Sequence, residues 1–259
     1  GFVSQVEIDV INSSTSLSTT DLGLPDEIDW ITSRAGQVLG DIVAVAACDA
    51  GYFEKYGEYF VKSFDETQSL HLHIVGADKE DVIAFQERFP NYNISFSIEE
   101  DKSDIGSPYY AMCRFIRAKE IQKKLDRDIF LTDVDISEVI GLKQLLAFSS
   151  SSEGDICVFQ GDTIVPWLRY PGAYMYLRNT AESAKYLSLL RLVCMDRLKN
   201  PKWFLDQSAI NSVNHYIWVN MPELRLKTIS SKDNFILNDI FISKFDLEEK
   251  KKIRKNADY

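Results

Sequence analysis

The sequence contains few histidines, cysteines and prolines, and it has no long run of apolar residues. Its 259 residues include 3 His, 4 Cys and 7 Pro. The longest unbroken apolar run, Ile42 to Cys48, is far too short for a membrane-spanning helix, which needs about 20 apolar residues. Basic residues are also outnumbered, because 29 Lys and Arg stand against 39 Asp and Glu. A formal charge of −10 repels phosphate backbones, so we expect neither a nucleic-acid partner nor a transmembrane segment.

The four cysteines show no CxxC spacing, and three of them lie in apolar runs such as Ile156-Cys157-Val158-Phe159. This pattern favours buried thiols over a zinc site or a disulfide framework. Buried thiols fit a reducing compartment, so we expect a cytoplasmic protein. A peripheral membrane location stays open, because the charged segment 246–259 fits either a solvated terminal helix or a membrane-surface patch, with the solvated helix favoured.

The chain is expected to consist of an N-terminal extension (1–40), one α/β domain (41–245) and a charged C-terminal helix or tail (246–259). Within the extension, a short helix is expected over 29–33. From residue 41, strands expected over 42–48, 70–75, 94–98 and 128–132 alternate with helices over 53–67, 79–89 and 108–125. Helices at 137–148, 180–198 and 204–213 and strands at 155–159, 173–177 and 234–242 are expected to follow. Alternation of strands and helices predicts a mostly parallel central sheet flanked by helices.

The clearest chemical signal is the apolar strand 129–132, which ends in Asp133-Val134-Asp135. In open α/β sheets, ligands bind just beyond the carboxyl ends of the strands. Two carboxylates separated by one residue suit Mn²⁺ or Mg²⁺, which bind a few carboxylates together with phosphate oxygens. The alternative is that both residues cap the next helix. The position directly after a buried strand favours a metal site that stabilises a departing diphosphate.

Three blocks, in order, resemble the GT-A (Rossmann-like) glycosyltransferases, closest to the retaining family of glycogenin and the bacterial lipopolysaccharide galactosyl- and glucosyltransferases. The resemblance extends from Asp41 to about Val213. Its first block is Ala46-Ala47-Cys48-Asp49-Ala50-Gly51-Tyr52. The second is Tyr110-Ala111-Met112-Cys113-Arg114-Phe115, which leads into Asp133-Val134-Asp135. The third is Phe204-Leu205-Asp206-Gln207-Ser208-Ala209-Ile210-Asn211.

The resemblance implies a hexosyltransferase that uses a nucleotide-diphosphate sugar, with a UDP-sugar as the expected donor and retention as the expected outcome. The acceptor is left open among a glycan, a lipid-linked acceptor and a protein. The family places the nucleotide base in the loop after the first strand, at Ala47 and Asp49, with Tyr52 stacked on the ring. An aromatic face suits a pyrimidine, and a carboxylate accepts from an imide N–H. The alternative for Tyr52 is that it only covers the edge of the sheet.

The resemblance also assigns roles further along the chain. Arg114 is expected to reach a phosphate or ribose oxygen or to pair with Asp133, with a surface ion pair as the alternative. Gly172 and Ala173 resemble the small residues that face the donor sugar, although their order is altered. Asp206 and Gln207 are the expected catalytic residues. The alternative for Asp206 is a carboxylate that offsets the dipole at a helix N-terminus.

Two other classes of function remain open. The family usually takes a third metal ligand from a late His, but no His follows His215. The third ligand is therefore expected to be His215, a late acidic residue such as Asp239, or water, and the alternative is a weak or dispensable metal. His71 and His73 are expected to be structural. Asp133 also fits the nucleophile of a haloacid-dehalogenase-type phosphatase. A degenerate transferase domain that only binds sugar is the non-enzymatic alternative.

Overall fold

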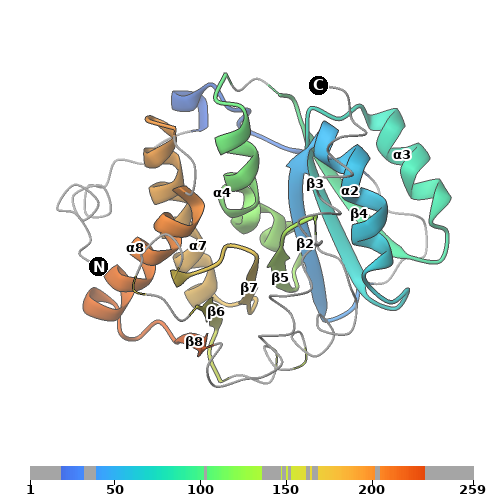
Figure 1. Cartoon of the computed structure of the whole chain (residues 1–259). Coiled ribbons are helices and arrows are strands. Elements are labelled where there is room, and N and C mark those ends of the chain that lie inside the picture. Colours follow the sequence, from blue (N-terminus) through green and yellow to red (C-terminus); the bar gives the residue numbers. More distant parts are fainter. Residues whose placement is uncertain are drawn as a thin grey trace.

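A computed structural model describes residues 19–31, 39–101, 104–135, 147, 150, 153–161, 164, 169–201 and 205–230 (Figure 1). Eight strands form one sheet in these residues. They are β1 (Asp29–Ile31), β2 (Ile42–Asp49), β3 (Ser69–Val75), β4 (Asn93–Glu99), β5 (Asp128–Thr132), β6 (Ile156–Gln160), β7 (Tyr174–Leu177) and β8 (Leu226–Ser230). The helical elements are η1 (Thr19–Leu22), α2 (Ala50–Lys62), α3 (Lys79–Arg88), α4 (Ser107–Leu125), α7 (Ala181–Leu198) and α8 (Leu205–Asn220).

The strand order is β1-β4-β3-β2-β5-β7-β6-β8. The central strands β4, β3, β2 and β5 run parallel, and β8 is parallel to β6. Antiparallel pairing joins β1 to β4 and places β7 between β5 and β6. This arrangement confirms the predicted α/β class with a mostly parallel sheet. The chain moves from β2 to β3 and β4 on one side and then crosses to β5 on the other, so the topological switch point lies between β2 and β5.

Helices cover both faces of the sheet: α2 and α3 lie on one side, and α4, α7 and α8 lie on the other (Figure 1). The side chains of β2 alternate between these two layers, as the period of a strand requires. Val43, Val45 and Ala47 join the buried cluster that contains α4, α7 and α8. Ala44, Ala46 and Cys48 join the cluster beneath α2 and α3. Because both faces of β2 are buried, its sequence is apolar from Ile42 to Cys48, and only its last residue, Asp49, is charged.

Most core elements agree with the sequence predictions, although the helix predicted over 53–67 spans Ala50–Lys62. The edges of the sheet agree less well. The helix predicted over 29–33 is wrong, because residues Asp29–Ile31 form β1. Pairing with β4 sets Trp30 beside Ser97, and the Trp30 ring packs 4.8 Å from the His71 ring. Strand β8 was not predicted, and α8 continues to Asn220. The predicted elements at 137–148, 234–242 and 246–259 lie outside the described residues.

The described part of the predicted extension joins the domain. It supplies β1 to the sheet, and Leu24 and Ile28 are buried in the core beside α4.

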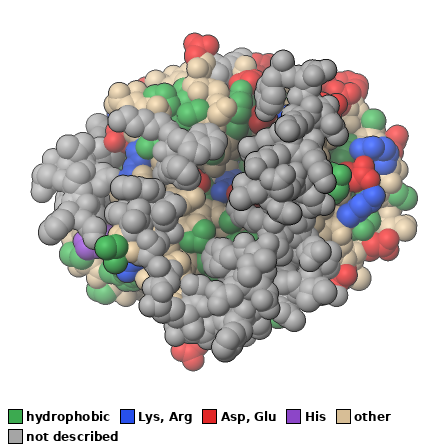
Figure 2. All heavy atoms as spheres, viewed as in Figure 1, with side chains coloured by type: hydrophobic (Ala, Val, Ile, Leu, Met, Phe, Trp, Pro, Cys, Tyr) green, Lys and Arg blue, Asp and Glu red, His purple; other side chains and the backbone are tan. Residues whose placement is uncertain are grey.

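All four cysteines are buried free thiols, as predicted. Acidic and basic side chains alternate on the surface near α3 (Figure 2). None of the described helices has both the length and the apolar character needed to cross a membrane.

Candidate active site at the switch point of the sheet

Asp133 and Asp135 emerge where β5 ends, beside the longer strand β2. The β2–β5 ladder pairs Val45 with Leu131, so both carboxylates follow β5 at the edge where β2 also approaches its end. Asp133 forms an ion pair with Nη1 of Arg114. Asp135 is buried and accepts a hydrogen bond from the Tyr52 hydroxyl at 3.2 Å. Both acidic side chains are therefore held by partners from other elements. The alternative helix-capping role concerns residues outside the described part.

Arg114 lies between two carboxylates. Its guanidinium contacts Asp133 through Nη1, and its Nη2 lies 3.9 Å from Oδ2 of Asp206. The same guanidinium lies 4.7 Å above the centre of the Phe115 ring. Burial alone would lower the pKa of Arg114, but the charges of Asp133 and Asp206 raise it above its usual value. A surface ion pair is excluded because Arg114 is only 6% exposed, and the predicted pairing with Asp133 is present.

Asp206 lies in the first turn of α8 and faces the same arginine. Burial raises the pKa of its carboxyl above the usual 3.8, the charge of Arg114 opposes this, and Asp133 adds to the rise. The dipole at the start of a helix favours a carboxylate, but in this site the loss of hydration is larger. Asp206, predicted from the sequence, therefore belongs to the same charged cluster as Asp133 and Arg114. Its neighbour Gln207 is partly buried in the same turn.

Gly172 lies directly against this cluster. A Cβ atom at Gly172 would lie 2.8 Å from Oδ2 of Asp206, 3.1 Å from Nη2 of Arg114 and 3.4 Å from Cζ of Phe115. These distances are too short for a methyl group without movement of the charged side chains. The missing side chain thus allows Asp206 and Arg114 to approach each other. Ala173 is buried in the other layer, in the cluster beneath α2 and α3.

The end of β2 forms the opposite side of the site. Asp49 caps α2, because its Oδ1 accepts the backbone N–H of Tyr52 at 3.0 Å. The Tyr52 ring packs on Tyr56 with centroids 4.5 Å apart. Ala47 is buried in the same cluster as Cys113. The sequence reasoning missed the capping role of Asp49, although the three-residue spacing from Asp49 to Tyr52 at the helix start is the usual signal.

Two tyrosines at this edge were not predicted as site residues. The Tyr110 hydroxyl donates to Oδ2 of Asp101 at 2.6 Å, and this hydrogen bond, followed by burial, raises the pKa of Tyr110 to about 12. Burial, followed by the charges of Asp133 and Asp135, raises the pKa of Tyr174. Tyr110 precedes Arg114 by four residues on α4, so the two share a helix face, and that spacing was the available signal.

The residues fit a divalent cation that takes some of its ligands from the protein and the others from a substrate and from water. Mg²⁺ and similar ions bind one or two carboxylates and take their other positions from phosphate and water, so Asp133 and Asp135 are a suitable donor set. Within the described residues, no group of three or more His, Cys, Asp or Glu side chains forms a candidate metal site. His215 is exposed on α8 and does not join the pair. Asp239 lies outside the described part.

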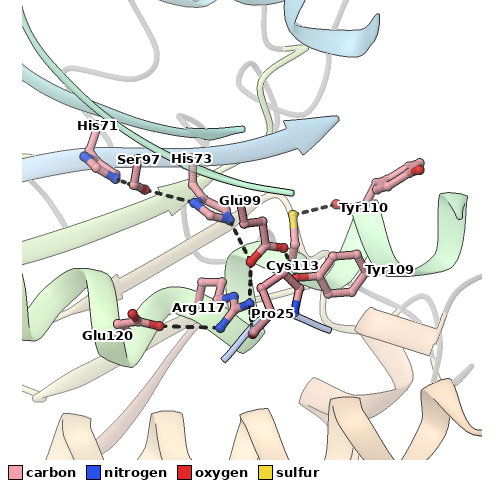
Figure 3. A network of polar contacts seen from close by, with 10 residues as sticks. All are labelled: Pro25, His71, His73, Ser97, Glu99, Tyr109, Tyr110, Cys113, Arg117 and Glu120. Atoms are coloured by element: carbon pink, nitrogen blue, oxygen red, sulfur yellow. Dashed lines mark hydrogen bonds and ion pairs between the residues drawn. The ribbon is translucent and has the colours of Figure 1, made fainter. Parts of the chain in front are cut away.

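His71 and His73 are structural, as predicted, and belong to a separate buried network (Figure 3). Both rings are within 2.9 Å of the Ser97 hydroxyl. From β4, Glu99 interacts with Tyr109 and Arg117 of α4. This network ties the β3–β4 half of the sheet to α4, the helix that carries Arg114.

The fold and the site define an α/β protein with an acidic candidate site at the switch point of its sheet. One arginine, Arg114, lies between two of the acidic side chains of this site. No protein-family model matches the sequence, and no curated protein is similar to it. Solved glycosyltransferase structures share part of the fold. GlyE of Streptococcus pneumoniae TIGR4 has 11% identity and a TM-score of 0.48 over 74% of this chain and 46% of GlyE.

The apo form of GlyE has 12% identity and a TM-score of 0.48 over 80% of this chain and 51% of that protein. Apo mouse xyloside xylosyltransferase 1 has 14% identity and a TM-score of 0.45 over 80% of this chain and 94% of that one. This chain therefore spans about half the length of the GlyE structures. These likenesses concern the fold alone, and the function is argued below from the site.

Proposed function

We propose that this protein is a metal-dependent glycosyltransferase that transfers a hexose from a nucleotide-diphosphate sugar, with a UDP-sugar as donor and with retention. One observation carries the proposal. Asp133 and Asp135 follow the central strand at the switch point, and Arg114 connects Asp133 to Asp206. This arrangement supports the proposal, because an acidic pair suited to a metal lies beside a third carboxylate and a cation in one partly buried site.

Asp133 and Asp135 would hold Mn²⁺ or Mg²⁺. When bound, the ion stabilises the negative charge that develops on the departing diphosphate. The protein's own contribution is to orient the two carboxylates before the donor arrives. Arg114 fixes Asp133 through their ion pair. Such outer contacts keep metal ligands in the orientation that binding requires.

Asp206 is the proposed catalytic carboxylate. From the first turn of α8 it can accept hydrogen bonds from sugar hydroxyls and stabilise positive charge at the anomeric carbon. Its burial supports this role, because electrostatic interactions strengthen when water is excluded. Gln207, in the same turn, would help to orient the donor sugar, which Gly172 and the backbone of Ala173 would border.

The base of the nucleotide would bind at the end of β2. In this proposal Tyr52 stacks on the base, while Asp49 and Ala47 border it. Asp49 already accepts the N–H of Tyr52 through Oδ1, so a contact to the base would use the carboxylate in addition to its capping role. A glycan, a lipid-linked acceptor or a protein would complete the reaction.

Nucleotide release tests the proposal directly. Purified protein is incubated with a panel of UDP- and GDP-sugars, in Mn²⁺ or in EDTA, and free nucleoside diphosphate is measured. We expect slow release from a UDP-sugar in Mn²⁺ only, because water can replace the acceptor. Turnover of p-nitrophenyl phosphate without any nucleotide requirement would instead support the phosphatase. Tight donor binding without release, in the presence of candidate acceptors, would support the sugar-binding module.

A further inference from the structure

We propose that Tyr52 is a positioning residue for Asp135, in addition to stacking on the base. The inference rests on the proposed function, because it treats Asp135 as a metal ligand. Its basis is the hydrogen bond from the Tyr52 hydroxyl to Oδ2 of Asp135, 3.2 Å long and 83 residues apart in sequence. One side chain would thus connect nucleotide binding with metal binding.

Tyr52 is held at its backbone and its ring as well as at its hydroxyl. Its N–H donates to the capping carboxylate of Asp49. Its ring lies against that of Tyr56, with centroids 4.5 Å apart, and Tyr56 is itself fully buried. A side chain fixed in this way has little rotational freedom left to lose when its hydroxyl meets Asp135. The tyrosine therefore spans the switch point, from the end of β2 to the end of β5.

Asp135 is 7% exposed. Burying a carboxylate is costly, and the hydrogen bond from Tyr52 offsets part of that cost. Its negative charge also reaches Cys48 and Tyr174, where burial is the first cause of a raised pKa and Asp135 adds to it. A hydroxyl that holds one carboxylate oxygen would set the direction of the other toward the cation. Loss of an outer-shell partner of this kind typically weakens metal binding by about 10- to 100-fold.

Replacing tyrosine by phenylalanine separates the two roles. Tyr52→Phe keeps the ring that would stack on a base and removes only the donor to Asp135. Tyr52→Ala removes both. Tyr59→Phe is the matched control, because Tyr59 lies on the same helix and is 47% exposed.

Isothermal titration of the whole chain provides the test, first with UDP, in EDTA and in Mn²⁺, and then, in buffer without EDTA, with Mn²⁺ added to the UDP-loaded protein. We expect Tyr52→Phe to bind UDP in EDTA as the wild type does. Its Mn²⁺ affinity should fall by roughly 10-fold or more. Tyr52→Ala should lose affinity in both titrations, whereas Tyr59→Phe should change neither. Melting curves identify any variant that does not fold.

Two results would overturn the inference while leaving the proposed function intact. The first is an unchanged Mn²⁺ affinity in correctly folded Tyr52→Phe. The second is a loss of UDP affinity in Tyr52→Phe that is equal with and without Mn²⁺. That result would mean that the Tyr52 hydroxyl contacts only the nucleotide. If the wild type itself binds UDP with no contribution from Mn²⁺, the metal-dependent function and this inference both fail.

Discussion

At the scale of single residues, the absence of a side chain at Gly172 shapes the site as much as any charge. A methyl group there would lie 2.8 Å from Oδ2 of Asp206. We expect Gly172→Ala to push Asp206 away from Arg114 and to lower the free energy of unfolding by about 1–3 kcal/mol, the usual cost of overpacking. Gly40→Ala is the control, since its Cβ would meet only the Ser69 hydroxyl at 3.4 Å. Urea unfolding measures both, and equal stability of the two variants would contradict the steric argument.

Asp206 gives the sharpest test of catalysis at this scale. If it stabilises the transition state, Asp206→Asn should reduce sugar transfer by a factor on the order of 100 while leaving UDP affinity nearly unchanged. Steady-state kinetics with the donor identified by the release assay measures the first, and titration calorimetry the second. Near-normal turnover in the folded variant would mean that Asp206 only offsets the dipole at the N-terminus of α8. The anomeric proton of the product, observed by NMR, decides between retention and inversion.

The same carboxylate makes stability depend on pH. Burial, partly opposed by Arg114, raises the folded-state pKa of Asp206 above 3.8. A raised pKa means that its contribution to stability is complete below the unfolded-state pKa and is lost as pH rises through the folded-state pKa. The unfolding free energy of the wild type, relative to Asp206→Asn, should therefore fall between acidic and neutral pH. A relative stability that rises over this range would show that Arg114 outweighs burial.

At the scale of elements, the buried network in Figure 3 holds α4 against β3 and β4. Glu99 is almost fully buried and pairs with Arg117, which also donates to the carbonyl of Pro25 at 2.7 Å. Removing one partner of a buried pair leaves the other uncompensated, at a cost of about 3–5 kcal/mol. We expect Glu99→Gln to lose an amount near the low end of this range, because the partly exposed Glu120 also faces Arg117.

Glu58→Gln is the control for this prediction, since Glu58 pairs with Lys62 on the exposed side of α2. Chemical denaturation should show almost no loss there. Burial would raise the pKa of Glu99, but His73, Arg117 and Tyr109 outweigh it and keep the pKa below 4.5. The stabilisation is thus present above the unfolded-state pKa and should disappear as the solution is acidified. Equal stability of Glu99→Gln and the wild type at neutral pH would contradict the pairing.

An element could be predicted where its own sequence carries the pattern of a strand or a helix. Strands β2 and β5 carry apolar runs, and β3 and β4 alternate apolar with polar residues, so all four have a local signal. Asp133, Asp135 and Arg114 stand at recognisable places relative to them. Strand β1 has only three residues, and its conformation depends on pairing with β4, which no local pattern shows. The steric role of Gly172 was equally hidden, because it depends on the meeting of α4, α8 and the start of β7.

At the scale of the whole molecule, the account rests on one arrangement: two halves of a sheet meet at β2 and β5, and the acidic pair lies where they meet. A ligand at that edge would contact α2, α4 and α8 at once. It would therefore link the two halves of the sheet. Binding to the folded state alone stabilises it, by about 2.7 kcal/mol when the ligand is present at 100 times its Kd. Ligand binding at the site can therefore be measured as an increase in the stability of the whole fold.

Thermal unfolding with UDP, in Mn²⁺ and in EDTA, tests the central claim most directly. The account predicts that UDP raises Tm more in Mn²⁺, because the carboxylate pair and the diphosphate would otherwise repel each other. Asp133→Asn and Asp135→Asn should abolish this difference, whereas Asp81→Asn, exposed in the first turn of α3, should retain it. Equal stabilisation by UDP in Mn²⁺ and in EDTA, or an undiminished Mn²⁺ effect in the two site variants, would contradict a metal-dependent nucleotide-sugar site.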